Sequence, residues 1–343
     1  MILNTPGNVK ELDELIASPS DEVIESIRKR DGDFTVLGAG GKMGYHLCLM
    51  LQKALAAAGK KSTVRAVSRF GSVRAGEEFE AIGCEVVRAD LSDREGLKAL
   101  PDSPNVFFLA GVKFGTSNDT GLLELMNVVM PRLVAERFRA SDIVALSTGC
   151  VYSFVTPESG GSTERDETNP PGEYAISCLG REKAFVDAAD RYGTRSALIR
   201  LNYSIDLRYG VLVDLAQKVI AGTPIDVTTG YVNLIWQGDA IRHTIRSLEH
   251  VSAPPFVINV TGDEILKVRD LARKFGDKFK REVDIVGSEA ATAWLSDASQ
   301  SHERFGRPEV SVDRMIDWVA EWLKSGGEQL GKPTHFETRD GKY

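Results

Sequence analysis

Three glycines spaced three residues apart, Gly38, Gly41 and Gly44, lie in the stretch LGAGGKMGYHL. Where such a triplet joins a strand to a helix, the chain can turn sharply and its backbone can approach a pyrophosphate, which the first N–H groups of the helix then face. The stretch therefore predicts a dinucleotide site, with a tight turn that binds nothing as the alternative. The residues predicted to contact the cofactor here are Gly38, Gly40, Gly41, Lys42, Met43 and Gly44.

The second expected strand ends in Ser68 and Arg69, and these two residues bear on the choice of cofactor. Sites that prefer NAD usually carry an acidic residue there, which accepts hydrogen bonds from the ribose hydroxyls. An arginine instead offers a charge-assisted fork to the 2′-phosphate of NADP. The pair favours NADP, with NAD as the alternative and a solvated surface arginine as the structural explanation.

Short apolar runs alternate with helix-like stretches from residue 34 onward, which is the context that the glycine turn requires. Strands separated by helices of this length predict βαβ units with right-handed crossovers, and strands that are apolar throughout fit a sheet covered on both faces. The predicted fold class is a doubly wound, Rossmann-type α/β parallel sheet with a smaller C-terminal α/β substrate-binding region. The expected strands are 34–38, 63–68, 85–89, 105–110, 142–147 and 196–201.

Four segments are expected along the chain. In the first, a helix should begin near Ser18, which can act as its cap, with Pro19 at the first helical position. The last segment, GKPTHFETRDGKY, is polar and unpatterned, which indicates a loose or wrapping tail, or else a lid or partner contact. The segments are an N-terminal helical extension (1–32), a dinucleotide-binding domain (33–201), a mainly substrate-binding region (202–330) and the polar tail (331–343).

Composition narrows the classes of function. Apolar residues make up 42% of the 343 residues and charged residues 27%, as in globular proteins, and no apolar run approaches the roughly 18 residues of a membrane span. The N-terminus has no secretory signal pattern, so a cytoplasmic location is expected. The net charge of −7 argues against broad affinity for nucleic acid. No metal is expected from the histidine spacing or from the widely separated cysteines, which are Cys48, Cys84, Cys150 and Cys178.

Further motifs follow in an order typical of one family. Asp90 and Leu91 come after the third expected strand, Ala110 and Gly111 after the fourth, and Asn127 lies in the helix that follows. With the glycine turn, these residues resemble the extended short-chain dehydrogenase/reductases, the family of nucleotide-sugar epimerases and dehydratases. The resemblance implies that the Asp–Leu pair contacts the adenine, that the two small residues lie beside the cofactor, and that the asparagine supports the catalytic helix.

The resemblance runs from about Phe34 to Lys324 and also places the reacting groups. Thr148, in STGCVY, stands where the family has its catalytic serine or threonine, and Tyr174, in GEYAISC, stands at its catalytic tyrosine. Four residues after that tyrosine the family has a lysine. This sequence has Cys178 there.

The exchange removes a cation from beside the tyrosine. A free tyrosine has a pKa of ~10, so matching it to neutral pH requires about 3 units, or roughly 4 kcal/mol, of stabilisation of the anion. A neutral thiol supplies none of this, and a thiolate opposes it. At about 100° per residue, Lys183 points to the opposite helix face and Arg181 lies about 10 Å further along the axis. Lys113, after the fourth expected strand, is the best candidate for a replacement, with a solvated loop lysine as the alternative.

The resemblance implies an NAD(P)-dependent oxidoreductase or epimerase/dehydratase acting on a sugar, sugar acid or similar polyol, with Tyr174 as the acid/base. The alternative is a catalytically impaired dinucleotide-binding sensor or regulatory protein of the same fold. VNLIWQGD lacks the arginine that binds the substrate diphosphate in many of the family's enzymes, which favours an unactivated sugar. Arg200, Arg208 and Arg242 remain as candidate anion ligands. The family's pairing of the catalytic helix with the helix after the fourth strand implies a homodimer.

Overall fold

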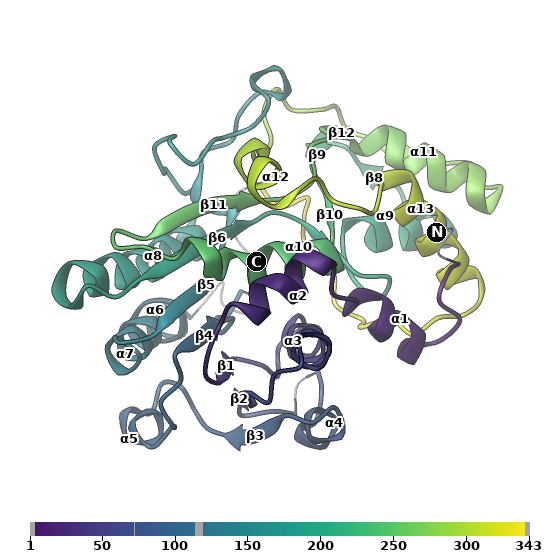
Figure 1. Ribbon diagram of the computed structural model, residues 1–343. Coiled ribbons are helices and arrows are strands. Elements are labelled where there is room, and N and C mark those ends of the chain that lie inside the picture. The colour runs from purple at the N-terminus through teal and green to yellow at the C-terminus, as the bar shows by residue number, and fades with distance from the viewer. Residues whose placement is uncertain (1–3, 72, 114–118, 340–343) are drawn as a thin grey trace.

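The computed structural model describes residues 4–71, 73–113 and 119–339. At its centre lies a parallel sheet of seven strands in the order β11-β6-β5-β4-β1-β2-β3 (Figure 1). The strands are β1 (Phe34–Leu37), β2 (Val64–Ser68), β3 (Glu85–Arg88), β4 (Asn105–Phe108), β5 (Asp142–Thr148), β6 (Ser196–Leu201) and β11 (Phe256–Val260). The six strands expected from the sequence are therefore present, each within two residues of its expected ends.

The sheet winds outward in both directions from β1. Phe34 is in register with Val64 of β2 on one side and with Asn105 of β4 on the other. Between β1 and β4 the order of the strands reverses, and at such a switch point the carboxyl ends of the two strands leave a crevice. The predicted doubly wound, Rossmann-type fold is confirmed.

Two hydrophobic cores lie on the two faces of the sheet, because successive side chains of a strand point to opposite sides. Phe34 and Val36 pack into the core that contains Leu47 of α3, whereas Leu37 packs into the other, with Val134 of α7. In Figure 1, α3 lies on one side of the sheet and α5, α6, α7 and α8 lie on the other. All residues of the central strands β1 and β4 are buried, as fits strands covered on both faces, whereas none of the edge strand β3 is buried.

Thirteen α-helices occur in the described ranges. A single turn of π-helix, Leu125–Val129, joins α6 to α7, and short 3₁₀ turns occupy Gly149–Val151, Pro157–Ser159 and Ser247–His250. The helices are α1 (Val9–Ile16), α2 (Asp21–Arg28), α3 (Gly44–Ala58), α4 (Gly76–Ala81), α5 (Arg94–Lys98), α6 (Thr120–Glu124), α7 (Met130–Arg137), α8 (Glu173–Tyr192), α9 (Val211–Ala221), α10 (Gln237–Arg246), α11 (Val268–Phe279), α12 (Ser299–Phe305) and α13 (Val312–Lys324).

The N-terminal extension is helical and packs on the sheet domain, with α2 against α3 and α10. The expected cap of α2 was wrong, because Ser20 and not Ser18 caps the helix. The Ser20 hydroxyl accepts a hydrogen bond from Val23 N at 3.4 Å, the three-residue spacing that an N-cap requires. α1 is tied down through Asp13, whose carboxylate is 2.8 Å from His46 Nε2.

The C-terminal half contains three small strand pairs, and no helix in the described ranges is long and apolar enough to cross a membrane. One strand of this half, β11, returns to the main sheet beside β6. The domain boundaries predicted above remain a prediction, and the segment 202–330 contributes to both regions. The small strands are β7 (Ser204–Ile205), β8 (Ile225–Asp226), β9 (Tyr231–Val232), β10 (Ile235–Trp236), β12 (Leu266–Lys267) and β13 (Ile285–Val286).

Candidate active site

A cleft of about 460 Å³ opens at the carboxyl ends of β1, β2, β3 and β4. This is where the switch point of the sheet places a ligand crevice. Nine of the predicted cofactor residues line it, namely Gly38, Gly40, Gly41, Ser68, Arg69, Asp90, Leu91, Ala110 and Gly111. Lining residues that the sequence reasoning missed are Phe70, Gly71, Ala89, Leu109, Met126 and Met130. Phe70, Ala89, Leu109 and Met126 each adjoin a predicted residue in the sequence. Met130 lies four residues after Met126, so adjacency and helical spacing were the available signals.

The glycine turn forms a cradle in which side chains would not fit. Gly38 has a φ of +83°, and a Cβ there would lie 2.6 Å from Ala110 N. At Gly40 a Cβ would lie 2.7 Å from Ser68 Oγ. Since no side chain caps the first turn of α3, its N–H groups are available to an anion. The turn therefore fits the pyrophosphate of a dinucleotide.

At the edge of the cleft, Arg69 is held only loosely. Its Nη1 is 3.5 Å from Asp90 Oδ2, and its side chain is 68% exposed. The Asp90 carboxylate is itself anchored by the hydroxyl of Ser92, at 2.7 Å, and this hydrogen bond lowers the pKa of Asp90. An exposed guanidinium next to an anchored carboxylate is compatible with either cofactor, so the preference for NADP remains a prediction.

Four predicted cofactor residues lie outside the lining of the cleft, and these are Lys42, Met43, Gly44 and Asn127. Gly44 serves packing, because a Cβ there would lie 2.2 Å from Ala39 O. Lys42 turns toward the C-terminal half, where its Nζ is 3.7 Å from the centroid of the Tyr209 ring. Burial there lowers the pKa of Lys42 to about 7, against the opposing charge of Asp206.

Asn127 lies within the π-helical turn and joins two parts of the site. Its amide nitrogen donates to Val112 O at 2.9 Å and to Ser177 Oγ of α8 at 2.9 Å. Its Oδ1 accepts from Val112 N at 3.0 Å. The side chain therefore links the loop after β4 to the first turns of α8.

Tyr174 and Cys178 lie on one face of α8, four residues apart. A hydrogen bond joins their side chains, and Cys178 is fully buried. Burial raises the pKa of Tyr174 well above its usual value, and the neighbouring thiols of Cys178 and Cys150 raise it further. Burial also raises the pKa of Cys178. The thiol at this position therefore adds nothing that would help to ionise the tyrosine.

Thr148 is the last residue of β5 and belongs to the same neighbourhood. Its Oγ1 accepts a hydrogen bond from Cys150 N at 3.2 Å. The Cys150 thiol acts electrostatically on Tyr174. The turn that begins at Thr148 is thus brought next to the start of α8.

Lys113 approaches Tyr174 from across the site. Its Nζ lies 5.7 Å from the centroid of the Tyr174 ring and 3.5 Å from the carbonyl oxygen of Thr334. Burial lowers the pKa of Lys113, whereas the thiols of Cys150 and Cys178 act to raise it. The structure thus brings Lys113 and Cys178 to Tyr174, and the turn that follows Thr148 contacts the helix that carries the tyrosine.

A second cation near Tyr174 is Arg181, which the sequence reasoning set aside for its distance along the helix. Its Nη2 donates to Asn127 Oδ1 at 2.7 Å and its Nη1 to Leu146 O at 3.0 Å. The positive charge of this buried guanidinium lowers the pKa of both Tyr174 and Cys178, although burial outweighs it at each. Burial reduces solvent screening, so its field reaches further than the helix spacing suggested.

The three arginines considered as anion ligands are engaged in ion pairs within the fold. Arg200 Nη2 is 2.8 Å from Glu182 Oε2, Arg208 Nη2 is 2.8 Å from Asp206 Oδ2, and Arg242 Nη1 is 3.2 Å from Asp239 Oδ1. Arg200 and Arg208 are almost fully buried with their partners. Binding a substrate anion at any of them would require a competing carboxylate to move.

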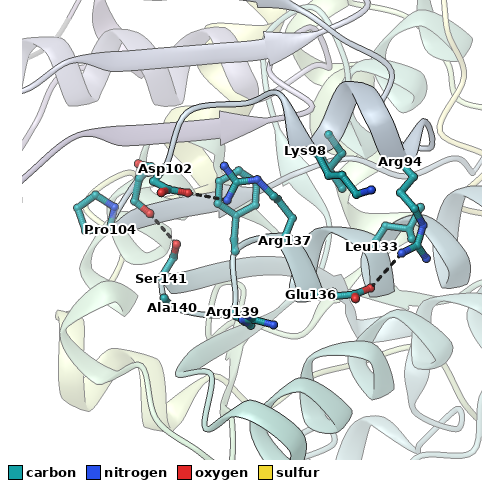
Figure 2. Close-up of a pocket in the computed structure, with 13 residues that line it drawn as sticks. Arg94, Lys98, Asp102, Pro104, Leu133, Glu136, Arg137, Arg139, Ala140 and Ser141 are labelled. Carbon is teal, nitrogen blue, oxygen red and sulfur yellow. Dashed lines mark hydrogen bonds and ion pairs between the residues drawn. The ribbon is translucent and has the colours of Figure 1, made fainter.

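A separate cavity of about 670 Å³ lies at the opposite edge of the sheet, where β4 and β5 begin (Figure 2). Four of its charged side chains form two ion pairs, Arg137 with Asp102 at 2.7 Å and Arg94 with Glu136 at 3.6 Å. It is remote from the carboxyl ends of the strands, where ligands bind in such sheets. Among the described residues, no group of three His, Cys, Asp or Glu side chains is arranged to hold a metal ion.

Residues 34–227 match the NAD dependent epimerase/dehydratase family. The match covers more than half of the 343 residues, so the chain belongs to this family, as the motifs predicted. No curated protein is significantly similar to it in sequence.

Solved structures of similar fold include three sugar-nucleotide epimerases. UDP-glucose 4-epimerase from Thermotoga maritima, solved with UDP-glucose, has a TM-score of 0.70 at 16% identity, over 86% of this chain and 99% of its own. UDP-glucuronic acid 4-epimerase from Bacillus cereus, solved with NAD, has a TM-score of 0.71 at 18% identity, over 85% and 98%. UDP-glucose 4-epimerase from Thermus thermophilus, also with NAD, has a TM-score of 0.69 at 18% identity, over 85% and 99%. At such identities the likeness is evidence for the fold.

Proposed function

We propose that this protein is an NAD(P)-dependent enzyme that oxidises, reduces or epimerises a carbon of a sugar, sugar acid or similar polyol. The observation that carries the proposal is that Tyr174 of α8 lies beside Lys113. Lys113 belongs to the loop that follows Ala110 and Gly111, two residues that line the cofactor cleft. When bound, a nicotinamide would supply the hydride acceptor or donor for such a reaction. The family and the NAD in the neighbouring structures support this class of chemistry.

In this proposal Tyr174 is the general acid/base. Its ionised phenolate oxygen takes the proton of a substrate hydroxyl during oxidation, and the hydroxyl so formed returns that proton during reduction. Thr148, at the end of β5, would hydrogen-bond the same substrate oxygen and orient it. Asn127 would keep α8 in register with the loop after β4 through its contacts with Ser177 and Val112.

Lys113 would replace the charge that the family supplies from the position of Cys178. An opposite charge at 4–6 Å favours the ionised form of an acid by about 1 to 3 pKa units. The ammonium of Lys113 lies 5.7 Å from the ring centroid of Tyr174, on the same side chain that would ionise. This supports an active rather than an impaired protein.

The test is a fluorescence titration with NADH and, separately, with NADPH, followed by a turnover screen with the tighter cofactor over free sugars, sugar acids and UDP-sugars. We expect Tyr174→Phe to abolish turnover while the cofactor affinity stays within about twofold, because the hydroxyl serves only the proton transfer. Full activity in this variant would refute the role of the tyrosine. If cofactor binds but nothing turns over, the protein is the dinucleotide-binding sensor, which should then distinguish oxidised from reduced cofactor.

We also infer a homodimer paired through α8 and the α6–α7 helices. Apolar side chains on these elements are exposed, Ile176 of α8 to 57% and Leu125 of the π-helical turn to 40%. Exposed apolar groups on adjacent helices favour burial against a second copy. Light scattering of Ile176→Asp should show a monomer where the natural protein shows a dimer, and a monomeric natural protein at micromolar concentration would refute the inference.

A further inference from the structure

The C-terminal segment 330–339 runs over the substrate side of the site. After α13, Leu330 N donates to Arg208 O at 3.2 Å. Thr334 then fastens to α9, where Asp214 Oδ2 accepts from its backbone N at 2.8 Å and from its hydroxyl at 2.5 Å. Glu337 pairs with Lys218 of the same helix. Residues 330–339 are therefore docked on the protein, and we call this segment the strap.

The strap reaches the reacting groups. The carbonyl oxygen of Thr334 is 3.5 Å from Lys113 Nζ, the ammonium that lies beside Tyr174. Tyr203, just after the carboxyl end of β6, is acted on electrostatically both by the Cys150 thiol and by Glu337 of the strap. The strap is thus separated from Tyr174 only by the side chain of Lys113, which contacts both.

The far end of the strap is anchored on the opposite wall. Arg339 Nη1 donates to Thr292 O at 2.7 Å, and its guanidinium lies 4.3 Å from the centroid of the Phe154 ring. Phe154 in turn stacks on Trp294, with ring centroids 4.4 Å apart. Between the two anchors Phe336 is only 2% exposed. The strap therefore bridges α9 and the loops around residues 154 and 292.

A nucleotide sugar would need open space along this path. Its diphosphate and base extend well beyond the reacting sugar, so the pocket must continue away from the tyrosine into a groove. The structural neighbours are matched along 98–99% of their own length, but only 85–86% of this chain is matched. About one seventh of this chain therefore has no counterpart in these neighbours.

We propose that the strap 330–339 sets the size of the substrate, so that the site accepts a free sugar or sugar acid and excludes a nucleoside-diphosphate sugar. This inference rests on the proposed function for the reaction that the site performs. The exclusion of nucleoside-diphosphate sugars does not depend on that reaction. The ion pairs that occupy Arg200, Arg208 and Arg242 agree with a site that has no diphosphate to bind.

The test is calorimetric titration of the full-length protein, saturated with NADH, with UDP-glucose and with UDP-glucuronic acid. We expect neither to bind the natural protein at millimolar concentration. Releasing the strap with the double substitution Arg339→Ala and Glu337→Ala should admit UDP-glucose with an affinity higher by about tenfold or more. Lys332→Ala, an exposed position on the same segment, is the matched control and should behave like the natural protein.

Micromolar binding of UDP-glucose to the natural protein would overturn the proposal. So would a released, folded double variant that binds UDP-glucose no better than Lys332→Ala does. Should the double variant unfold, Glu337→Gln, which removes only the ion pair with Lys218, takes its place with the same expectation in smaller degree. These measurements need no turnover, so a failed reaction assignment at Tyr174 would leave their outcome unchanged.

Discussion

The ammonium group of Lys113 lies 5.7 Å from the centroid of the Tyr174 ring, so a cation faces the tyrosine from the loop after β4 and not from α8. On α8 itself, the position four residues on holds the buried thiol of Cys178. A charge acts on a neighbouring acid through distance and burial, whichever element carries it. In the proposed mechanism, the loop after β4 would therefore supply the charge that the family supplies from α8.

Removing the charge of Lys113 should make Tyr174 harder to ionise. We expect Lys113→Met to raise the pKa of Tyr174 by about 1 unit, since a nearby opposite charge favours the ionised form of an acid. Ultraviolet difference titration, with Tyr174→Phe as the reference, measures this. Lys183→Met, which removes an exposed lysine from the opposite face of α8, should leave the titration unchanged. If the natural protein, Lys113→Met and Lys183→Met gave identical titrations, the ammonium of Lys113 would not act on the tyrosine.

The two thiols near Tyr174 should differ in reactivity. Cys178 is fully buried and its pKa is raised by that burial, so little thiolate forms at neutral pH. Cys150 is partly exposed. We expect iodoacetamide to label Cys150 at least about tenfold faster than Cys178 in the folded protein, as followed by peptide mass spectrometry. Equal rates would mean that α8 opens readily, and labelling after unfolding in urea provides the control.

Arg69 is expected to decide between the two cofactors. Its exposed guanidinium can turn from Asp90 to a 2′-phosphate, which Arg69→Ala would leave unpaired. We expect this variant to bind NADPH about tenfold more weakly and NADH within about twofold of the natural protein. Fluorescence titration of both cofactors with both proteins measures the ratio. An equal loss for NADH and NADPH would contradict the predicted preference for NADP.

The cofactor cleft was largely predictable from sequence because its determinants are local. Gly38 at a φ of +83°, with Ala110 N too close for a Cβ, is imposed by the turn itself. Ser68 and Asp90 follow directly from where their strands end. Strand ends of a doubly wound sheet meet at one edge, so locating the strands was enough to bring these residues together.

Contacts between distant segments could not be read in this way. The bond between Thr334 and Asp214 joins residues 120 apart in sequence, and nothing in a polar tail indicates which surface it will cover. The direction of Lys42 likewise depends on Tyr209, which belongs to the other half of the chain. Arg200 looked like a candidate anion ligand because the sequence does not reveal that Glu182 is its partner.

The buried ion pair of Arg200 and Glu182 should contribute strongly to stability. Both side chains are about 6–7% exposed, and the pair is completed by the Ser147 hydroxyl, at 2.6 Å from Glu182. Removing one partner leaves an uncompensated buried charge, which typically costs about 3–5 kcal/mol. We expect Arg200→Met to lower the free energy of unfolding by this order in urea denaturation. The double variant with Glu182→Gln should regain part of the loss, and equal stability of the double and single variants would argue against a coupled pair.

Asp239 should make the protein less stable as the pH rises from about 4 to about 6. Burial raises the pKa of this carboxyl group to about 6, although Arg242 opposes the shift. In that window the unfolded chain has already lost the proton that the folded chain still holds, so each rise in pH favours unfolding. A difference of about 2 pKa units corresponds to ~3 kcal/mol as an upper value. Asp239→Asn removes the titrating group, so the stability of the natural protein relative to this variant should fall between about pH 4 and about pH 6, measured by urea unfolding of both proteins across that range. A relative stability that stays constant would show that Asp239 ionises in the folded protein as it does in the unfolded chain.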